Sequence, residues 1–182
     1  MQKKIYVLMG PSGSGKTTLG NELKKMGIVE LINTTTRDIR IGEIPNVSYY
    51  FVNADEFRCT EMIEKTEYAG NYYGMSKVEV DTKLSSHDRL YTILDSHGAM
   101  EFKKIYGSDV VKIIYIYCSQ KTLEERMILR GDSVEKINER LDYITKTGEL
   151  DNIGIADYVI INDKNTYETS VSLLKTITNC DL

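Results

Sequence analysis

Long apolar runs alternate with amphipathic segments along the chain. Three runs are almost continuously apolar: residues 5–9, 90–94 and 110–117. Such strands are typical of a parallel sheet that is covered on both faces. Between and after these runs we expect helices over residues 17–26, 100–106 and 164–179, and a short strand over residues 28–32. This order of strands and helices predicts an α/β fold with a parallel core sheet and right-handed βαβ connections.

The loop after the first apolar run has the composition of a phosphate-binding site. Residues 10–17, GPSGSGKT, fit the pattern G-x-x-x-x-G-K-S/T between a predicted strand and a predicted helix. Glycines allow backbone N–H groups to turn towards a polyphosphate, at which the positive end of the helix also points. Lys16 can reach the outer phosphates, and the Thr17 hydroxyl can ligate Mg²⁺. An ordinary glycine turn would not require this Lys-Thr pair.

We therefore expect a purine nucleoside triphosphate at this loop. The residues expected to contact it are Gly10, Pro11, Ser12, Gly13, Ser14, Gly15, Lys16, Thr17 and Thr18.

Composition limits what can surround the loop. The 182 residues, 41% of them hydrophobic, suit one domain with a substantial core. The apolar runs are far shorter than the ~20 residues that a membrane helix needs, so we expect no membrane association and a cytoplasmic location. The formal net charge of −4 argues against broad binding of nucleic acid. Three cysteines without C-x-x-C spacing indicate neither a disulfide framework nor a zinc site.

Two arginines three residues apart, Arg37 and Arg40, lie in a polar segment whose threonines and Gly42 disfavour a helix. On a loop, two such cations can grip a phosphate, although in isolation they would more often be solvated surface charges. With its neighbours this segment reads TTTRDIRIGE…SYYFV. It resembles the guanylate kinase signature T-T-R-x-x-R-x-G-E followed by Y-x-F, and GPSGSGKTT is also that family's form of the loop.

Further blocks resemble the same family in the same order. They are EKTEYAGNYYG (64–74), LDSHG (94–98), LEERMILRG (123–131) with INERL (137–141), and DYVIIND (157–163). The resemblance implies a three-layer P-loop NTP hydrolase-type fold in a single domain. Its core would comprise residues 1–32, 87–119 and 148–182, with a small NMP-binding lobe at about 33–86 and a helical lid at about 120–147. It also implies a kinase that transfers the γ-phosphoryl of ATP to GMP or dGMP with Mg²⁺.

The resemblance assigns roles to individual residues. The acceptor GMP would be contacted by Asn33, Arg37, Arg40, Tyr49, Glu64, Tyr73, Met75 and Asp95. Among these, Glu64 would read the base, because a carboxylate accepts both N–H donors of the guanine pairing edge. The catalytic groups would be Lys16, Arg126, Arg130, Arg140 and Asp95. Asp95 would organise Mg²⁺ indirectly, and Asn162 would contribute to the ATP site.

Without the resemblance, several of these positions have simpler explanations. Tyr49 and Tyr73 occur in Tyr-Tyr pairs typical of half-buried strands. Glu64 would by default lie on a solvated helix face. Asp95 follows a predicted strand, which places it at the carboxyl edge of the sheet, but it could also simply cap a helix that begins near Ser96.

The spacing of the lid arginines is informative by itself. Arg126 and Arg130 are four residues apart and share a helix face, where like charges repel by roughly 0.2–0.5 kcal/mol unless an anion lies near them. Glu124 and Glu125 could partly provide that charge, so a purely structural explanation remains open. A break between two lid helices is expected at residues 132–133.

The chain departs from the family pattern at three residues that bear on specificity. Asn33 stands where a serine usually contacts the base, and Met75 stands where a serine or threonine is expected. Ser76 could compensate for the lost hydroxyl by a local shift. Ile93 replaces an aspartate that commonly precedes Asp95 by two residues. These changes leave open a kinase with another acceptor, either a different nucleoside monophosphate or a sugar phosphate.

A non-catalytic binding module is the other alternative. The intact Lys-Thr pair and the three lid arginines oppose it, because a peptide-binding protein has no physical need for a triphosphate site. The sequence does not indicate an oligomeric state.

Overall fold

The computed structural model of the protein describes residues 2–68 and 70–180. Its core is a five-stranded parallel sheet with the strand order β2-β7-β1-β8-β9. The strands are β1 (Lys4–Met9), β2 (Val29–Glu30), β7 (Arg89–Ile93), β8 (Val111–Tyr117) and β9 (Tyr158–Ile161). Every residue of the central strand β1 is buried, which explains its continuous apolar run.

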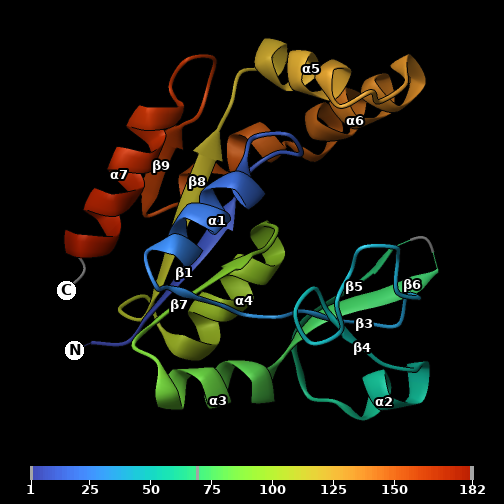
Figure 1. The fold of residues 1–182 in the computed structure, drawn as a ribbon, viewed down its shortest axis with the longest axis vertical. Coiled ribbons are helices and arrows are strands. Elements are labelled where there is room, and N and C mark those ends of the chain that lie inside the picture. The colour runs from blue at the N-terminus through green and yellow to red at the C-terminus, as the bar shows by residue number, and fades with distance from the viewer. Residues whose placement is uncertain (1, 69, 181–182) are drawn as a thin grey trace.

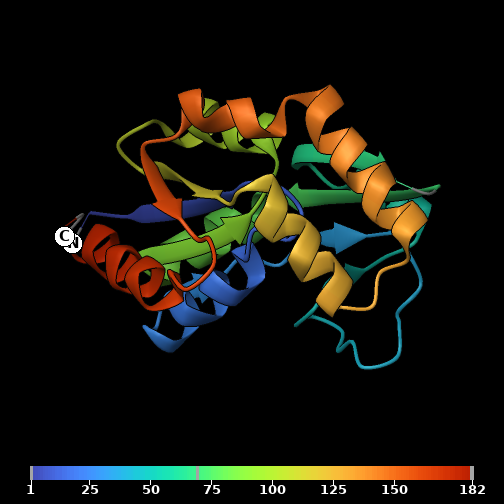
Figure 2. The same ribbon diagram turned by 90° about the horizontal axis from the view of Figure 1, so that it is seen from above.

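Helices cover both faces of the core sheet, as Figures 1 and 2 show. On one face, α1 (Lys16–Lys25) and α7 (Tyr167–Cys180) bury apolar side chains such as Leu19, Leu23 and Leu174 against the sheet. On the other face, α3 (Lys77–Ser86) and α4 (Ser96–Tyr106) contribute Val80 and Phe102 to a second apolar cluster. The predicted three-layer α/β fold with a parallel core sheet is therefore confirmed.

A second, smaller sheet is built from the chain between β2 and α3. Its strand order is β4-β3-β6-β5, with β3 parallel to β4 and the other pairs antiparallel. The strands are β3 (Thr34–Thr35), β4 (Tyr50–Phe51), β5 (Met62–Tyr68) and β6 (Asn71–Ser76). A short helix, α2 (Ala54–Cys59), begins at a capping box formed by Asn53 and Glu56. Figure 1 shows this sheet beside the layers of the core.

A pair of helices follows β8. They are α5 (Gln120–Leu129) and α6 (Val134–Thr147), and a 3₁₀ segment, η1 (Glu149–Ile155), leads from α6 into β9. Ser119 and Ser133 cap the two helices through their hydroxyl groups. Gly148 ends α6 in the left-handed conformation, with a φ of 63°. The two helices share a small apolar cluster that includes Leu123, Met127, Ile137 and Ile144.

Several element boundaries differ from those expected from the sequence. The helix expected at residues 100–106 begins at Ser96, because Asp95 caps it. The closing helix begins at Tyr167 rather than residue 164, after a left-handed Asn165 with a φ of 62°. Glu64 lies in strand β5, so its default placement on a helix face is wrong. Across residues 2–68 and 70–180, no helix is long and apolar enough to cross a membrane.

Candidate active site

The loop between β1 and α1 wraps around the start of a helix that has no side-chain cap. Gly15 precedes α1 with a φ of 99°, and no side chain accepts a hydrogen bond from the first turn. A Cβ at Gly15 would lie 2.3 Å from Nδ2 of Asn162, and one at Gly10 would lie 2.4 Å from the Ile116 carbonyl oxygen. Only glycine fits these close approaches. The loop therefore presents N–H groups at the positive end of a helix dipole, which is the requirement for binding a phosphate.

Lys16 lies between two pockets and lines both of them. One pocket, of about 490 Å³, extends from the loop to the start of α7, and the other, of about 440 Å³, extends to the end of β7. The ammonium group donates hydrogen bonds to the carbonyls of Gly10 (2.7 Å) and Pro11 (3.0 Å). Burial lowers the pKa of Lys16, and the nearby Glu149 carboxylate opposes that shift.

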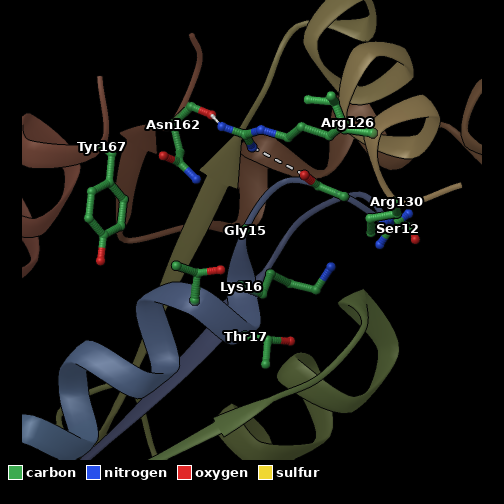
Figure 3. A pocket seen from close by; sticks show the side chains of 11 residues that line it. Ser12, Gly15, Lys16, Thr17, Arg126, Arg130, Asn162 and Tyr167 are labelled. Carbon is green, nitrogen blue, oxygen red and sulfur yellow. Dashed lines mark hydrogen bonds between the residues drawn. The ribbon is translucent and has the colours of Figure 1, made fainter. Parts of the chain in front are cut away.

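Arg126, on α5, and Asn162, which follows β9, both donate hydrogen bonds to the loop. The Arg126 guanidinium donates to the carbonyls of Gly13 (3.1 Å), Ser14 (3.2 Å) and Asn162 (3.0 Å), as Figure 3 shows in part. The Asn162 side chain is buried, and its Nδ2 donates to the Ser14 carbonyl at 2.7 Å. This hydrogen bond from Asn162 helps to fix the conformation of the loop.

The other two lid arginines share one carboxylate. Arg130 and Arg140 each donate to Oδ2 of Asp132 at 3.0 Å, and their side chains are 49% and 42% exposed. Asp132 lies in the link between α5 and α6. Glu124 and Glu125 could have neutralised Arg126 and Arg130, but among the described residues neither carboxylate pairs with these two arginines, and Glu125 instead pairs with Lys164 at 3.4 Å.

Two acidic residues, Asp95 and Glu149, line the pocket of about 440 Å³ together with Lys16. Asp95 follows β7 at the carboxyl edge of the core sheet, and its Oδ1 accepts a hydrogen bond from the Gly98 amide at 2.8 Å. Both explanations of Asp95 are thus compatible: it caps α4 and also lines the pocket. Glu149 lines the same pocket and has its pKa raised by burial, with Lys16 opposing. Sequence analysis missed Glu149, because it carries no local motif and reaches Lys16 only through the fold.

Glu64 lies close to Asp95. A Cβ at Gly98 would lie 3.2 Å from Cγ of Glu64, so the Glu64 side chain packs against the first turn of α4. Burial raises the pKa of Glu64 to about 7, and the negative charge of Asp95 adds to this shift. The backbone N–H of Met75 opposes it. A carboxylate on strand β5 is thereby placed beside the edge of the core sheet.

The two residues that replace family hydroxyls differ in their placement. The Met75 side chain is fully buried in the apolar cluster beneath α3 and α4, so the expected contact between this side chain and a ligand finds no support. Ser76 does not compensate, because its hydroxyl is buried and accepts the Glu79 amide as the cap of α3. Asn33 keeps a buried Oδ1 without a hydrogen-bond partner among the described residues.

A basic and aromatic cluster lies in the small sheet and its loop. Arg37 makes a bidentate pair with Glu43 at 2.7 and 3.0 Å, and its Cζ lies 5.4 Å from the ring centroid of Tyr49. The rings of Tyr49 and Tyr73 meet edge to face at 6.2 Å. Arg40 is exposed nearby and bonds to Glu43 through its backbone, because its N–H donates to Glu43 Oε2 at 2.8 Å and its carbonyl accepts from the Glu43 amide at 3.1 Å. The structure thus gathers the four residues expected to contact a monophosphate.

The fold and site define the class of the protein. A phosphate-binding loop at the edge of a parallel sheet, with arginines from a helical pair and a separate small sheet, is typical of P-loop kinases. The sequence model described as guanylate kinase matches residues 2–179. The chain therefore belongs to the guanylate kinase family.

Relatives in several bacteria agree with this assignment. The chain is 36% identical to the guanylate kinase of Bartonella henselae over 179 residues, which cover 95% of this chain and 79% of the relative. It is also 36% identical to the guanylate kinase of Trichodesmium erythraeum over 167 residues, or 88% of each. The crystal structure of guanylate kinase from Anaplasma phagocytophilum superposes with a TM-score of 0.74 at 27% identity, covering all of this chain and 87% of that one.

Proposed function

We propose that this chain is a guanylate kinase, which transfers the γ-phosphoryl group of ATP to GMP or dGMP and forms ADP and GDP or dGDP. The observation that carries the proposal is the position of Glu64. Its carboxylate packs against the first turn of α4, beside the pocket that Asp95 shares with Lys16. A base reader and a phosphate loop are thereby brought to the same edge of the core sheet.

The donor would occupy the pocket of about 490 Å³ between the loop and α7. Backbone N–H groups of residues 12–18 would hold the phosphates, with Arg126 and Asn162 keeping the loop in shape. Lys16 would leave its carbonyl partners and follow the transferring phosphoryl group. Arg130 and Arg140 would exchange Asp132 for the phosphates, because a triphosphate carries more negative charge than one carboxylate.

Mg²⁺ fits the oxygen donors at this site. Thr17 is exposed in the first turn of α1, and Asp95 lines the adjoining pocket, which Lys16 also lines. Mg²⁺ prefers such oxygen ligands together with substrate phosphates and water. When bound, the ion neutralises charge on the phosphates. Thr17 would hold it directly, and Asp95 would act through its water shell.

The acceptor would bind between the small sheet and Asp95. Arg37, Arg40, Tyr49 and Tyr73 would hold the monophosphate, for which Arg37 must give up part of its pairing with Glu43. The Glu64 carboxylate would accept the two guanine N–H donors. Asn33 would make a second contact to the base by donating its amide N–H to the guanine O6; its buried Oδ1 has no hydrogen-bond partner among the described residues.

The chemistry needs little beyond positioning and charge. An in-line transfer would place four charged groups, those of Lys16, Arg126, Arg130 and Arg140, around the phosphoryl group. Glu149 faces Lys16 and would keep its ammonium group charged despite burial, because a nearby carboxylate favours the protonated form. Closure of the lid at about 120–147 and of the lobe at about 33–86 over the core would exclude water.

A kinase with a different acceptor is the alternative that specific residues favour. Asn33 and Ile93 both depart from the family pattern beside the acceptor site. The buried position of Met75 makes that residue neutral on this question, because its side chain is not available to either acceptor.

The test is a coupled assay for ADP release with ATP and Mg²⁺. The acceptor panel contains GMP, dGMP, AMP, CMP, UMP and ribose phosphates. We expect strong preference for the two guanine nucleotides and loss of activity in Lys16→Met. Lys104→Met is the matched control, since Lys104 is exposed on α4 and pairs only weakly with Glu101, at 3.4 Å. Turnover of another acceptor would show that the proposed substrate is wrong. No ADP release with any acceptor of the panel would favour a non-catalytic binding module.

A further inference from the structure

The donor pocket has an aromatic wall at the end away from Lys16. Tyr167 is the first residue of α7, lines this pocket, and is 39% exposed. Figure 3 shows its ring on the side opposite to the direction in which Lys16 extends. Of the described residues that line the pocket, Tyr167 is the only aromatic one.

The ring is held in place from behind. Its hydroxyl donates to Oε1 of Glu22 on α1 at 3.0 Å, and Glu22 is itself paired with Lys25 at 2.7 Å. The hydrogen bond to Glu22 raises the pKa of Tyr167, so the hydroxyl stays protonated as a donor. A ring anchored at its polar tip can offer its face to a ligand without losing much side-chain freedom on binding.

Polar side chains at this end are already engaged. The Asn162 amide donates to the Ser14 carbonyl, and Arg126 is bonded to three backbone carbonyls. Each therefore has fewer N–H groups left with which to read the edge of a base. The other large apolar side chain of the pocket is Leu129, at the end of α5, which is 86% exposed.

We propose that Tyr167 is the platform on which the base of the donor nucleotide stacks. The inference rests on the proposed function in one respect, the assignment of this pocket to ATP. With the phosphates on the loop at Lys16, the nucleoside extends towards Thr18 and α7, where the ring lies. The ring recognises the base through the stacked area rather than through hydrogen bonds. Purine nucleotides, which have the larger base, therefore bind more tightly than pyrimidine nucleotides. Leu129 covers the opposite face of the base when the lid closes.

A purely structural role for Tyr167 makes a different prediction. If the ring only joins α7 to α1 through Glu22, then Tyr167→Phe and Tyr167→Ala should both lose that link and behave alike. If the ring stacks on the base, Tyr167→Phe should keep donor binding and Tyr167→Ala should lose it. The pair of variants therefore separates the two roles.

The experiment is calorimetric titration of the full chain with ADP and with CDP. We expect Tyr167→Ala to weaken ADP about 10-fold and to narrow the preference for ADP over CDP, as the loss of one base-stacking contact predicts. Tyr167→Phe should stay within about twofold of the parent, and the affinity for GMP should not change in either variant. Equal ADP affinity in Tyr167→Ala and the parent overturns the proposal, as does equal weakening in Tyr167→Ala and Tyr167→Phe.

A third variant tests stacking while it keeps an aromatic ring at this position. The sequence contains no tryptophan, so Tyr167→Trp introduces a single tryptophan whose emission can be followed. ADP should quench its emission, whereas GMP alone should not. No change with ADP at saturating concentration would contradict stacking. Because both readouts use ADP, they stand even if the acceptor proves not to be GMP.

Discussion

At the scale of single residues, the acceptor site depends on a carboxylate that its surroundings tend to neutralise. Burial and the charge of Asp95 raise the pKa of Glu64 from 4.5 to about 7. Guanine binding requires the ionised form, because only a carboxylate can accept two N–H bonds without offering a proton of its own. The fold therefore places the pKa of Glu64 close to neutral pH, where the side chain changes into the ionised form that guanine binding requires.

The first prediction concerns the pH dependence of GMP binding. Between pH 8 and pH 6, protonation of Glu64 should weaken the affinity for GMP about 10-fold. The phosphate of GMP also titrates near pH 6, so Glu64→Gln is the necessary comparison. This variant should bind GMP weakly at pH 8 and should lack the component of the profile centred near pH 7. A profile shared by the parent and Glu64→Gln would remove Glu64 from the base site.

The same prediction has a counterpart in folding stability, which should fall as the pH rises, whereas the affinity for GMP should increase. A carboxyl group whose pKa is raised in the fold stabilises it below the ordinary pKa of 4.5, and this contribution is lost as the pH rises through about 7. Glu64→Gln should therefore raise the free energy of unfolding relative to the parent at pH 8 and not at pH 4. Denaturant titrations at the two pH values measure this difference.

Some of the residue assignments could be made from sequence and others could not. Lys16 and Thr17 were predictable because a short motif determines both the local backbone and the chemistry. The burial of Met75 was not, because a shift of one residue in strand register decides whether its side chain enters the apolar cluster beneath α3 and α4. Glu149 and Tyr167 reach the pockets from distant parts of the chain and belong to no motif that sequence analysis could have found.

At the scale of elements, the link between α5 and α6 supplies the carboxylate that pairs with two of the lid arginines. Asp132 pairs with Arg130 and Arg140 while both arginines remain more than two-fifths exposed. Exposed pairs of this kind contribute at most about 1 kcal/mol to stability. A triphosphate carries several charges and can displace Asp132 at little cost. The link therefore holds both guanidinium groups on one exposed carboxylate, and of the two arginines Arg130 lines the donor pocket.

The second prediction is that Asp132→Asn frees these arginines. We expect the free energy of unfolding to change by less than about 1 kcal/mol. The affinity for ADP should rise by about two- to fivefold, because a competing anion has been removed. Asp142→Asn on α6 is the matched control, since Asp142 is exposed and pairs only with Lys146 at 3.8 Å. Weaker ADP binding in Asp132→Asn would show that the carboxylate positions the arginines rather than competing for them.

Element types were more predictable than element ends. The runs over residues 5–9, 90–94 and 110–117 became β1, β7 and β8, because burial on both faces demands continuous apolar sequence. Ends depend on single contacts. Asp95 starts α4 four residues before its apolar segment. The strand expected over 28–32 shortens to Val29–Glu30, because beyond Glu30 the chain leaves the core sheet for the smaller one.

At the scale of the whole molecule, the site is divided among three parts of the fold, of which the small sheet also packs into the core cluster through Ile63 and Met75. The core sheet supplies the loop and Asp95, the small sheet supplies Glu64 and the tyrosines, and the cluster shared by α5 and α6 positions the arginines. Figure 1 shows the small sheet and the helical pair on the same side of the core, and large apolar side chains remain exposed on both, including Ile41 and Leu129. Approach of these parts would bury apolar surface and bring the charged groups together.

The third prediction is that both substrates together close the molecule. An analogue that joins adenosine and guanosine through a polyphosphate should reduce the radius of gyration in solution scattering. It should also slow amide exchange in α5, α6 and residues 36–48. ADP alone should protect mainly the helical pair, and GMP alone mainly the small sheet, because each contacts one part. Closure excludes water, so the analogue complex should show the greatest protection of both parts. Unchanged scattering dimensions together with unchanged exchange would mean that the parts are rigidly placed and that phosphoryl transfer proceeds without closure.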